Sequence, residues 1–165
     1  MPFCMQCGSL LEERVPAGDD RPRLACPSCG YIAYVNPKVV VGTLPIVDGK
    51  ALLLRRAIEP GLGCWTYPGG FLEMGESTEE GACREAEEEL GVSVGRLRLL
   101  GVYSRPAVGI VTIVYLADLV DGTPRPTAEA LEAAFFGPEE VPWDELAFPT
   151  TVSALRDWVS SVSTR

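Results

Sequence analysis

Apolar positions along the chain divide it into short strands and two helices. The stretch Lys38–Val47 is rich in β-branched side chains and predicts a strand, and Asp48-Gly49 predicts a hairpin turn after it. Trp65–Phe71 is expected to be extended, with an interruption at Pro68-Gly69-Gly70. Further strands are expected at three apolar segments, Leu97–Ser104, Ile110–Leu119 and Leu131–Phe136, and at the partner of the first hairpin, Ala51–Arg55.

Two segments show helical periodicity. Ser77–Leu90 repeats small or apolar residues at every fourth position, which gives a narrow face suited to close packing on a sheet: Ala82, Ala86 and Leu90. Ser77 and Glu80 have the spacing of a capping box, and Gly91 predicts the end of the helix. Thr150–Val162 forms a second amphipathic pattern. Strands, helix, strands and helix in this order predict an α/β or α+β layered domain.

Length and charge narrow the class of protein. With 165 residues, the chain suits one ordinary domain or a domain with a small appendage. The formal net charge of −9 argues against a protein whose main task is to bind nucleic acid. It does not exclude an anionic small-molecule substrate, because bound divalent cations can reverse the local charge of a site.

The location of the protein is also an expectation from sequence. No apolar run reaches the roughly 20 residues that a membrane-spanning helix needs. Only three residues precede Cys4, which is too few for a signal peptide. We therefore expect a cytoplasmic protein with no membrane association.

Four cysteines are paired near the start of the chain. Cys4-x2-Cys7 is followed by 18 residues and then by Cys26-x2-Cys29. Two such pairs bring four thiolates to one tetrahedral ion, and the spacing is typical of a structural zinc ribbon. A segment of this size has too little core to fold by burial alone. We predict a zinc ribbon over residues 1–36 and a second domain over residues 37–165, with a redox dithiol or disulfide pairing as the alternative.

Glutamates crowd the predicted helix at Ser77–Leu90. Five of the six residues from Arg84 to Glu89 are charged, and four of these are glutamates. Glu85 and Glu89 form a like-charge pair one turn apart, which destabilises an isolated helix. Mg²⁺ or Mn²⁺ would remove the conflict, because these ions favour oxygen ligands. The alternative is a solvated acidic helix face, the usual meaning of a charge run.

The spacing of these residues resembles a known motif. Residues 70–92 match G-x5-E-x7-R-E-U-x-E-E-x-G-U, where U is aliphatic, so the chain resembles the Nudix hydrolase family. The specified positions that match are Gly70, Glu76, Arg84, Glu85, Glu88, Glu89 and Gly91. Ala86 is smaller than the usual residue at its position but is apolar and favours a helix. The resemblance implies a mixed sheet sandwiched between helices.

The resemblance also implies roles for single residues. Arg84 orients a ligand carboxylate, most plausibly that of Glu88, and Glu76 supports the junction between loop and helix. A carboxylate from a later loop acts as base or extra ligand; Glu129 and Glu132 are the candidates, and we prefer Glu129. The implied ligands of the catalytic Mg²⁺ or Mn²⁺ are the carboxylates of Glu85, Glu88 and Glu89 and the carbonyl of Gly69.

A four-cysteine ribbon before a Nudix domain resembles two groups. One is the NADH pyrophosphatase and RNA-deNADding group, whose Ser-Gln-Pro-Trp-Pro-Phe-Pro signature is replaced here by residues 103–107, Tyr-Ser-Arg-Pro-Ala. The other includes plant FAD pyrophosphatases and resembles this chain over nearly its whole length, together with the ADP-ribose pyrophosphatase class. By analogy with the family, a homodimer is expected.

The resemblance predicts hydrolysis of the diphosphate in a nucleoside diphosphate linked to another moiety, such as FAD, ADP-ribose or NADH. The alternatives are an enzyme that removes a nucleotide cap from RNA and a nucleotide sensor without turnover. One of the two arginines that end the strand near the box is expected to contact a phosphate, and aromatic rings are expected to stack on the base. The residues chosen for substrate binding are Arg55, Trp65, Tyr103 and Phe148.

Overall fold

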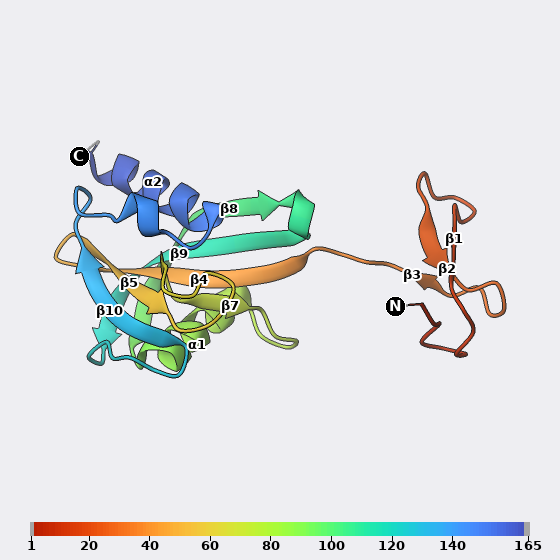
Figure 1. Ribbon diagram of the computed structural model, residues 1–165, viewed down its shortest axis with the longest axis horizontal. Helices are drawn as coiled ribbons and strands as arrows, with labels where there is room; N and C mark the ends of the chain where they lie inside the picture. Colours follow the sequence, from red (N-terminus) through yellow and green to blue (C-terminus); the bar gives the residue numbers. More distant parts are fainter. Residues whose placement is uncertain (1, 164–165) are drawn as a thin grey trace. The chain divides into compact units, whose positions relative to one another are not determined.

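The computed structural model describes residues 2–163 and divides the chain into two compact units, Met1–Asn36 and Pro37–Arg165 (Figure 1). The first unit is a small antiparallel sheet in the order β1-β2-β3. Its strands are β1 (Glu12–Arg14), β2 (Arg23–Ala25) and β3 (Ile32–Ala33). Its core is correspondingly small: Cys4, Leu11 and Cys26 are buried, and three partly buried side chains pack on them, namely Leu24, Tyr31 and Ala33.

The second unit is built on one mixed sheet in the order β10-β5-β4-β9-β8. The central strands β4 and β9 are parallel, and the other pairs are antiparallel. The strands are β4 (Lys38–Val47), β5 (Lys50–Arg56), β6 (Trp65–Thr66), β7 (Gly69–Phe71), β8 (Ser93–Arg105), β9 (Ile110–Asp121) and β10 (Ala130–Phe136). This mixed sheet, its two helices and the small sheet of the cysteine-containing unit confirm the predicted fold class.

A short segment fills the middle of this sheet. Strands β4 and β5 pair only next to their hairpin, at Ile46 and Val47, and then diverge. β6 pairs with β5 and β7 pairs with β4, so residues 65–71 occupy the space between the two strands. This insertion brings Gly69 and Gly70 beside the centre of the sheet, where the first helix lies.

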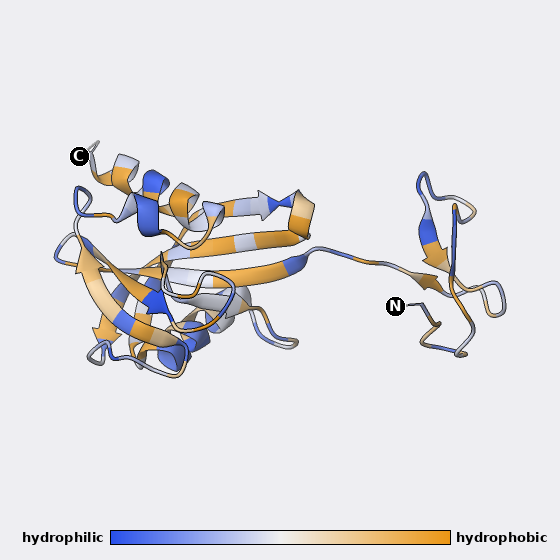
Figure 2. Ribbon diagram, viewed as in Figure 1, coloured by the Kyte–Doolittle hydropathy of each residue, from blue (hydrophilic) through white to orange (hydrophobic). Residues whose placement is uncertain are grey.

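Two helices cover opposite faces of the sheet, α1 (Thr78–Leu90) and α2 (Pro149–Ser163) (Figure 1). The alternation of side chains along β5 shows how the two layers are built. Leu52 and Leu54 pack with α1, whereas Ala51 and Leu53 pack with α2. Figure 2 shows the apolar residues concentrated along the strands between the helices. Two short 3₁₀ helices, Pro106–Val108 and Trp143–Glu145, complete the unit.

Most predicted elements are confirmed, with shifts at their ends. The strand predicted at Lys38–Val47 has those bounds, and the final helix begins at Pro149, one residue before the predicted Thr150. The largest difference is β8, which begins at Ser93 rather than Leu97. Register shifts within β8 interrupt the alternation of apolar residues, which hid its first part from the sequence pattern. Among the described residues, no helix has the length and apolarity to span a membrane.

Candidate active site and zinc site

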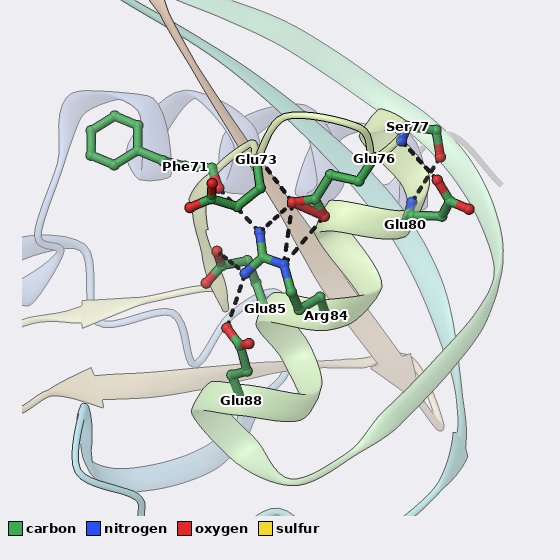
Figure 3. Close-up of polar contacts among 8 residues, drawn as sticks. All are labelled: Phe71, Glu73, Glu76, Ser77, Glu80, Arg84, Glu85 and Glu88. Atoms are coloured by element: carbon green, nitrogen blue, oxygen red, sulfur yellow. Dashed lines mark hydrogen bonds and ion pairs between the residues drawn. The ribbon is translucent and has the colours of Figure 1, made fainter.

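The helix α1 starts and ends as its sequence predicts. Ser77 Oγ accepts a hydrogen bond from the Glu80 N–H at 3.2 Å, and Glu80 Oε2 accepts one from the Ser77 N–H at 2.7 Å, so the capping box is present (Figure 3). Gly91 ends the helix in the left-handed region, with φ 65°, and its N–H donates to the Glu87 carbonyl. The two caps therefore set where the helix begins and ends.

Small residues let α1 lie close to β4 and β7. Gly81, Ala82 and Ala86 are buried on the face of the helix that meets the sheet. A Cβ atom at Gly81 would lie 2.9 Å from the side chain of Leu72 and 3.1 Å from that of Val41. The close approach brings the glutamates of α1 to the backbone of β7.

Arg84 joins three carboxylates on this side of the sheet (Figure 3). Its Nη1 lies 2.7 Å from Glu85 Oε1 and 2.9 Å from Glu88 Oε2, and its Nη2 lies 2.9 Å from Glu76 Oε1. Nη2 also donates to the Phe71 carbonyl at 3.1 Å, which ties the helix to β7. Glu88 is the partner of Arg84 expected from sequence, and Glu85 and Glu76 are two further partners.

Glu76 connects this network to the loop before the helix. Its Oε1 accepts a hydrogen bond from the Glu73 N–H at 2.8 Å in addition to its contacts with Arg84. Arg84 and this N–H lower the pKa of Glu76, so the carboxylate is charged at neutral pH. The structure thus places Glu76 at the junction of loop and helix.

Glu89 is the buried member of the acidic set. Glu89 is only 4% exposed, and its Oε2 accepts a hydrogen bond from the Gly69 N–H at 2.7 Å. Burial raises the pKa of the Glu89 carboxyl to about 7, although the Gly69 N–H and the charge of Arg56 oppose the shift. No ion pair of Glu89 is found among residues 2–163. A buried carboxylate with this little compensation favours binding of a cation.

The backbone of β7 is shaped to meet these carboxylates. In the antiparallel pair of β4 and β7, hydrogen-bonded residue pairs alternate with pairs that are not hydrogen-bonded. The Thr43 N–H donates to the Pro68 carbonyl and the Leu72 N–H to the Val39 carbonyl, so Gly69 falls in a pair that is not hydrogen-bonded. Gly69 therefore turns its N–H and carbonyl away from β4. At Gly70, a Cβ atom would lie 2.5 Å from Glu85 Oε1, so the Glu85 carboxylate occupies space that only glycine leaves free.

These groups make an oxygen-rich set that fits a hard divalent cation. The Glu85, Glu88 and Glu89 carboxylates and the Gly69 carbonyl are the donors that Mg²⁺ and Mn²⁺ prefer. Within the described chain, their oxygens are not gathered as tightly as the cysteine sulfurs below. Glu88 instead contacts Arg84 Nη1 at 2.9 Å, and Glu89 accepts a hydrogen bond from the Gly69 N–H at 2.7 Å.

The two candidates for an additional carboxylate lie in different surroundings. Glu129 is exposed just before β10, and its charge raises the pKa of both Glu85 and Glu89. Glu132 instead lies opposite Arg55 in the β10–β5 ladder, with its Oε2 3.8 Å from Arg55 Nη1. The electrostatic effect on Glu85 and Glu89 favours Glu129 as the additional carboxylate.

The residues expected to bind substrate are mostly engaged with the protein. Trp65 is 6% exposed, and its ring meets Phe136 edge-on at 5.0 Å between centroids. Tyr103 donates from its hydroxyl to Asp157 Oδ2 at 2.8 Å. Residue type alone does not show whether an aromatic ring is buried in the core or open to a ligand. Trp65 therefore offers no open face for a base and is left out of the site proposed below.

The remaining two substrate candidates also have protein partners. Arg55 Nε donates to the Gly63 carbonyl at 2.7 Å, and its guanidinium is directed toward Glu132. The ring of Phe148 lies beneath the guanidinium of Arg56, with 5.1 Å from Cζ to the centroid. By alternation along β5, Arg56 shares the face of Leu52 and Leu54, which pack with α1, whereas Arg55 was the arginine expected from sequence to contact a phosphate.

The four paired cysteines meet in the first unit. Their sulfur atoms all lie within 4.8 Å of one another, with Cys4 and Cys26 buried and Cys7 and Cys29 exposed. Gly8 and Gly30 follow the second cysteine of each pair and have positive φ angles of 75° and 78°. Their N–H groups donate to the carbonyls of Cys4 and Cys26, which closes each turn. Four sulfurs and no histidine suit tetrahedral zinc.

Comparisons with known proteins agree with this geometry. A family model described as the NUDIX domain matches residues 36–158, and one described as Nudix N-terminal, a zinc ribbon, matches residues 2–35. An ADP-ribose pyrophosphatase of Methanocaldococcus jannaschii is 38% identical over 122 residues, which are 72% of this chain and 71% of that protein. The crystal structure of a NUDIX hydrolase from Nitrosomonas europaea superposes with a TM-score of 0.92 at 41% identity, covering 99% of this chain and 93% of that one.

A second kind of relative is longer than this chain. A protein of Pseudomonas aeruginosa named NAD-capped RNA hydrolase NudC is 31% identical over 134 residues. The match covers 80% of this chain but only 46% of that protein. The chain thus spans about half of the length of such relatives.

Proposed function

Because this chain belongs to the Nudix hydrolase family, we propose that it hydrolyses the diphosphate of a nucleoside diphosphate linked to another moiety. The products are AMP and a second monophosphate. The observation that carries the proposal is the buried carboxylate of Glu89, which lies beside the backbone of Gly69 and would be stabilised by a cation. Glu85 and Glu88 lie on the same helix. ADP-ribose is the first substrate to test, since a relative that bears this activity in its name matches over 71% of its length.

We assign the catalytic cation, Mg²⁺ or Mn²⁺, to the Glu85, Glu88 and Glu89 carboxylates and the Gly69 carbonyl. When bound, it supplies positive charge against the diphosphate oxygens and makes water more acidic. The residues around the ligands then determine their positions. Arg84 holds Glu85 and Glu88 by charge-assisted hydrogen bonds, and the missing side chain at Gly70 leaves room for Glu85.

The chemical step needs a group to accept a proton. Water oxygen forms a bond to one phosphorus, the bond from that phosphorus to the bridging oxygen breaks, and the bridging oxygen leaves with the other phosphate. Glu129 accepts the proton that the attacking water loses. Its exposure and its electrostatic proximity to Glu85 and Glu89 support this role.

We propose that the ribbon binds a structural zinc ion. Its core of three buried residues is small, and metal binding supplies folding free energy to such modules. Reduced cysteines and a nucleotide substrate are both consistent with a cytoplasmic protein.

The test is release of AMP from ADP-ribose, FAD and NADH, each with Mg²⁺ or Mn²⁺. Glu88→Gln and Glu89→Gln are expected to lower kcat by roughly two orders of magnitude or more, since each removes an anionic ligand. Glu87→Gln is the matched control, because Glu87 is exposed on the same helix and faces away from the sheet. Full activity in both ligand variants would overturn the assignment of the acidic set.

A second candidate substrate is NAD-capped RNA, which the names of several relatives support. The same assay with a short NAD-capped RNA distinguishes it from a free dinucleotide. Cleavage of the capped RNA with a kcat/KM above that of ADP-ribose would favour this candidate. A rise in Tm with ADP-ribose but without AMP release would instead indicate a sensor.

A further inference from the structure

Arg56 is a buried cation for which no ion pair is found in the part of the chain that the structure describes. The residue is only 8% exposed, yet none of the ion pairs found among residues 2–163 includes it. A buried charge is costly unless other groups compensate it. The neighbouring Arg55, in contrast, is more exposed and has Glu132 within 4 Å. The buried guanidinium of Arg56 therefore remains available to an anion that binds from outside the chain.

The alternation of β5 directs the two arginines to different faces. Leu52 and Leu54 face α1, so Arg56, two positions further, points to the same side. Its partner in the β10 ladder, Ala130, also belongs to the apolar cluster of that side. Arg56 therefore lies on the face of the sheet that α1 covers, and α1 carries the acidic set.

Two contacts fix the orientation of the guanidinium. Nε donates to the carbonyl of Pro60 at 2.8 Å, and Phe148 lies against the guanidinium plane with 5.1 Å between Cζ and the ring centroid. The Pro60 carbonyl fixes the guanidinium at Nε, and the Phe148 ring covers one face of the guanidinium plane. No hydrogen bond or ion pair of the two Nη groups is found in the described part of the chain. These groups form the donor fork that matches two phosphate oxygens.

We propose that Arg56 binds the diphosphate of the substrate through its Nη groups, opposite the cation held by Glu85, Glu88 and Glu89, and that Phe148 positions Arg56 rather than stacking on a base. This inference rests on the proposed function, because it assigns the phosphates of the same substrate. It replaces Arg55 as the phosphate contact and gives Phe148 a different role from the one expected from sequence.

The first experiment measures binding of inorganic pyrophosphate by calorimetry in the presence of Mg²⁺, without turnover. Arg56→Gln is expected to weaken this binding by roughly 10- to 100-fold, as for loss of a charge-assisted bidentate contact. Arg56→Lys keeps the charge but not the fork and is expected to fall between Arg56→Gln and wild type. Arg55→Gln is the matched control and is expected to bind pyrophosphate within about twofold of wild type.

Thermal unfolding separates binding from a structural role. If Arg56 only ties Pro60 to Phe148, Arg56→Gln will lower Tm and leave pyrophosphate affinity unchanged, which would overturn the proposal. If that variant does not fold, Arg56→Lys carries the test, since it keeps a cation at the same position. Wild-type affinity in a folded Arg56→Lys variant would then overturn the proposed fork.

The second experiment concerns Phe148. Phe148→Leu is expected to weaken pyrophosphate binding, and the double variant with Arg56→Gln is expected to bind no more weakly than Arg56→Gln alone. Adenosine, which has a base but no phosphate, is expected to bind Phe148→Leu as it binds wild type. Weaker binding of adenosine with unchanged binding of pyrophosphate would overturn the positioning role and restore Phe148 as a base contact.

The two proposals fail in different ways. Absence of AMP release from every tested nucleotide would contradict the proposed function, whereas the pyrophosphate measurement would still report on Arg56. Conversely, AMP release by Arg56→Gln with wild-type kcat and KM would contradict the role of Arg56 alone.

Discussion

At the scale of single residues, the site depends on a few side chains that hold others in place. Arg84 contacts Glu76, Glu85 and Glu88 at 2.7–2.9 Å, so one planar cation bridges the loop before α1 and two carboxylates on it. A guanidinium can do this because its donors point in several fixed directions, which an ammonium group cannot reproduce.

Arg84→Lys is expected to lower kcat by roughly 10- to 100-fold, because a single ammonium cannot hold all three carboxylates and the Phe71 carbonyl. Steady-state AMP release with Mg²⁺ checks this. The matched control is Arg98→Lys on the exposed part of β8, which is expected to leave kcat unchanged. Equal activity of the two variants would contradict a positioning role for Arg84.

Thr43 in β4 carries a buried hydroxyl for which the described residues supply no hydrogen-bond partner. The residue is fully buried in β4, and its Oγ1 has no hydrogen bond within the part of the chain that the structure describes. A buried hydroxyl that loses its contact with water costs about 1–3 kcal/mol.

Thr43→Val is therefore expected to stabilise the protein by about 1 kcal/mol, measured by urea unfolding. Thr151→Val is the control, since Thr151 is equally buried but its hydroxyl lies 2.9 Å from that of Thr66. That change is expected to destabilise by about 1 kcal/mol. Destabilisation by both substitutions would show that Thr43 has a partner in solution.

At the scale of secondary-structure elements, the site is the meeting of α1 with the inserted strand β7. The small residues of α1 let it approach, and the outward N–H of Gly69 reaches Glu89. The two elements are close only because β7 lacks side chains at the point of contact. Gly70 is the clearest case, since a Cβ atom there would lie only 2.5 Å from Glu85 Oε1.

Gly70→Ala is expected to displace the Glu85 carboxylate and to lower metal-dependent kcat by roughly tenfold or more. The measurement is AMP release as a function of Mg²⁺ concentration. Gly137→Ala is a matched control, because its Cβ would also approach a glutamate at 3.1 Å, but that glutamate is the exposed Glu140, which is not part of the acidic set. A Gly70→Ala enzyme with the wild-type Mg²⁺ dependence would argue against Glu85 as a ligand.

At the scale of the whole molecule, two units have separate cores and different sources of stability. The unit of residues 37–165 buries large apolar side chains from sheet and helices, such as Leu44, Leu155 and Trp158. The unit of residues 1–36 relies on three buried residues, of which two are cysteines. Metal binding is therefore expected to matter far more for the smaller unit.

Removal of zinc by a chelator is expected to unfold the ribbon and leave the larger unit folded. All three tryptophans, Trp65, Trp143 and Trp158, lie in the larger unit, so their fluorescence reports its unfolding alone. The midpoint of the tryptophan transition is expected to stay constant while four additional thiols become reactive. A parallel fall in this midpoint would mean that the larger unit depends on the metal as well.

Local signals were sufficient for much of this protein. The ends of α1 were predictable because capping needs only residues a few positions apart, here Ser77, Glu80 and Gly91. The β-branched run predicted β4 with its bounds, and the cysteine spacing predicted a cluster of four sulfurs. The order of elements and the spaced glutamates also predicted the fold class and the family, since both are written in short stretches of sequence.

Choices between neighbours required the tertiary structure. Arg55 and Arg56 are chemically identical in the sequence, but Arg55 lies beside Glu132 and Arg56 lies on the face of β5 that packs on α1. The same holds for Glu129, whose charge acts on Glu85 and Glu89, and Glu132, which lies beside Arg55. A shift of one residue reverses the face of a strand, and which face meets a helix or a glutamate is decided by packing between distant segments. The sequence by itself determined the elements and the chemistry of α1; only the assembled sheet decided which side chains face it.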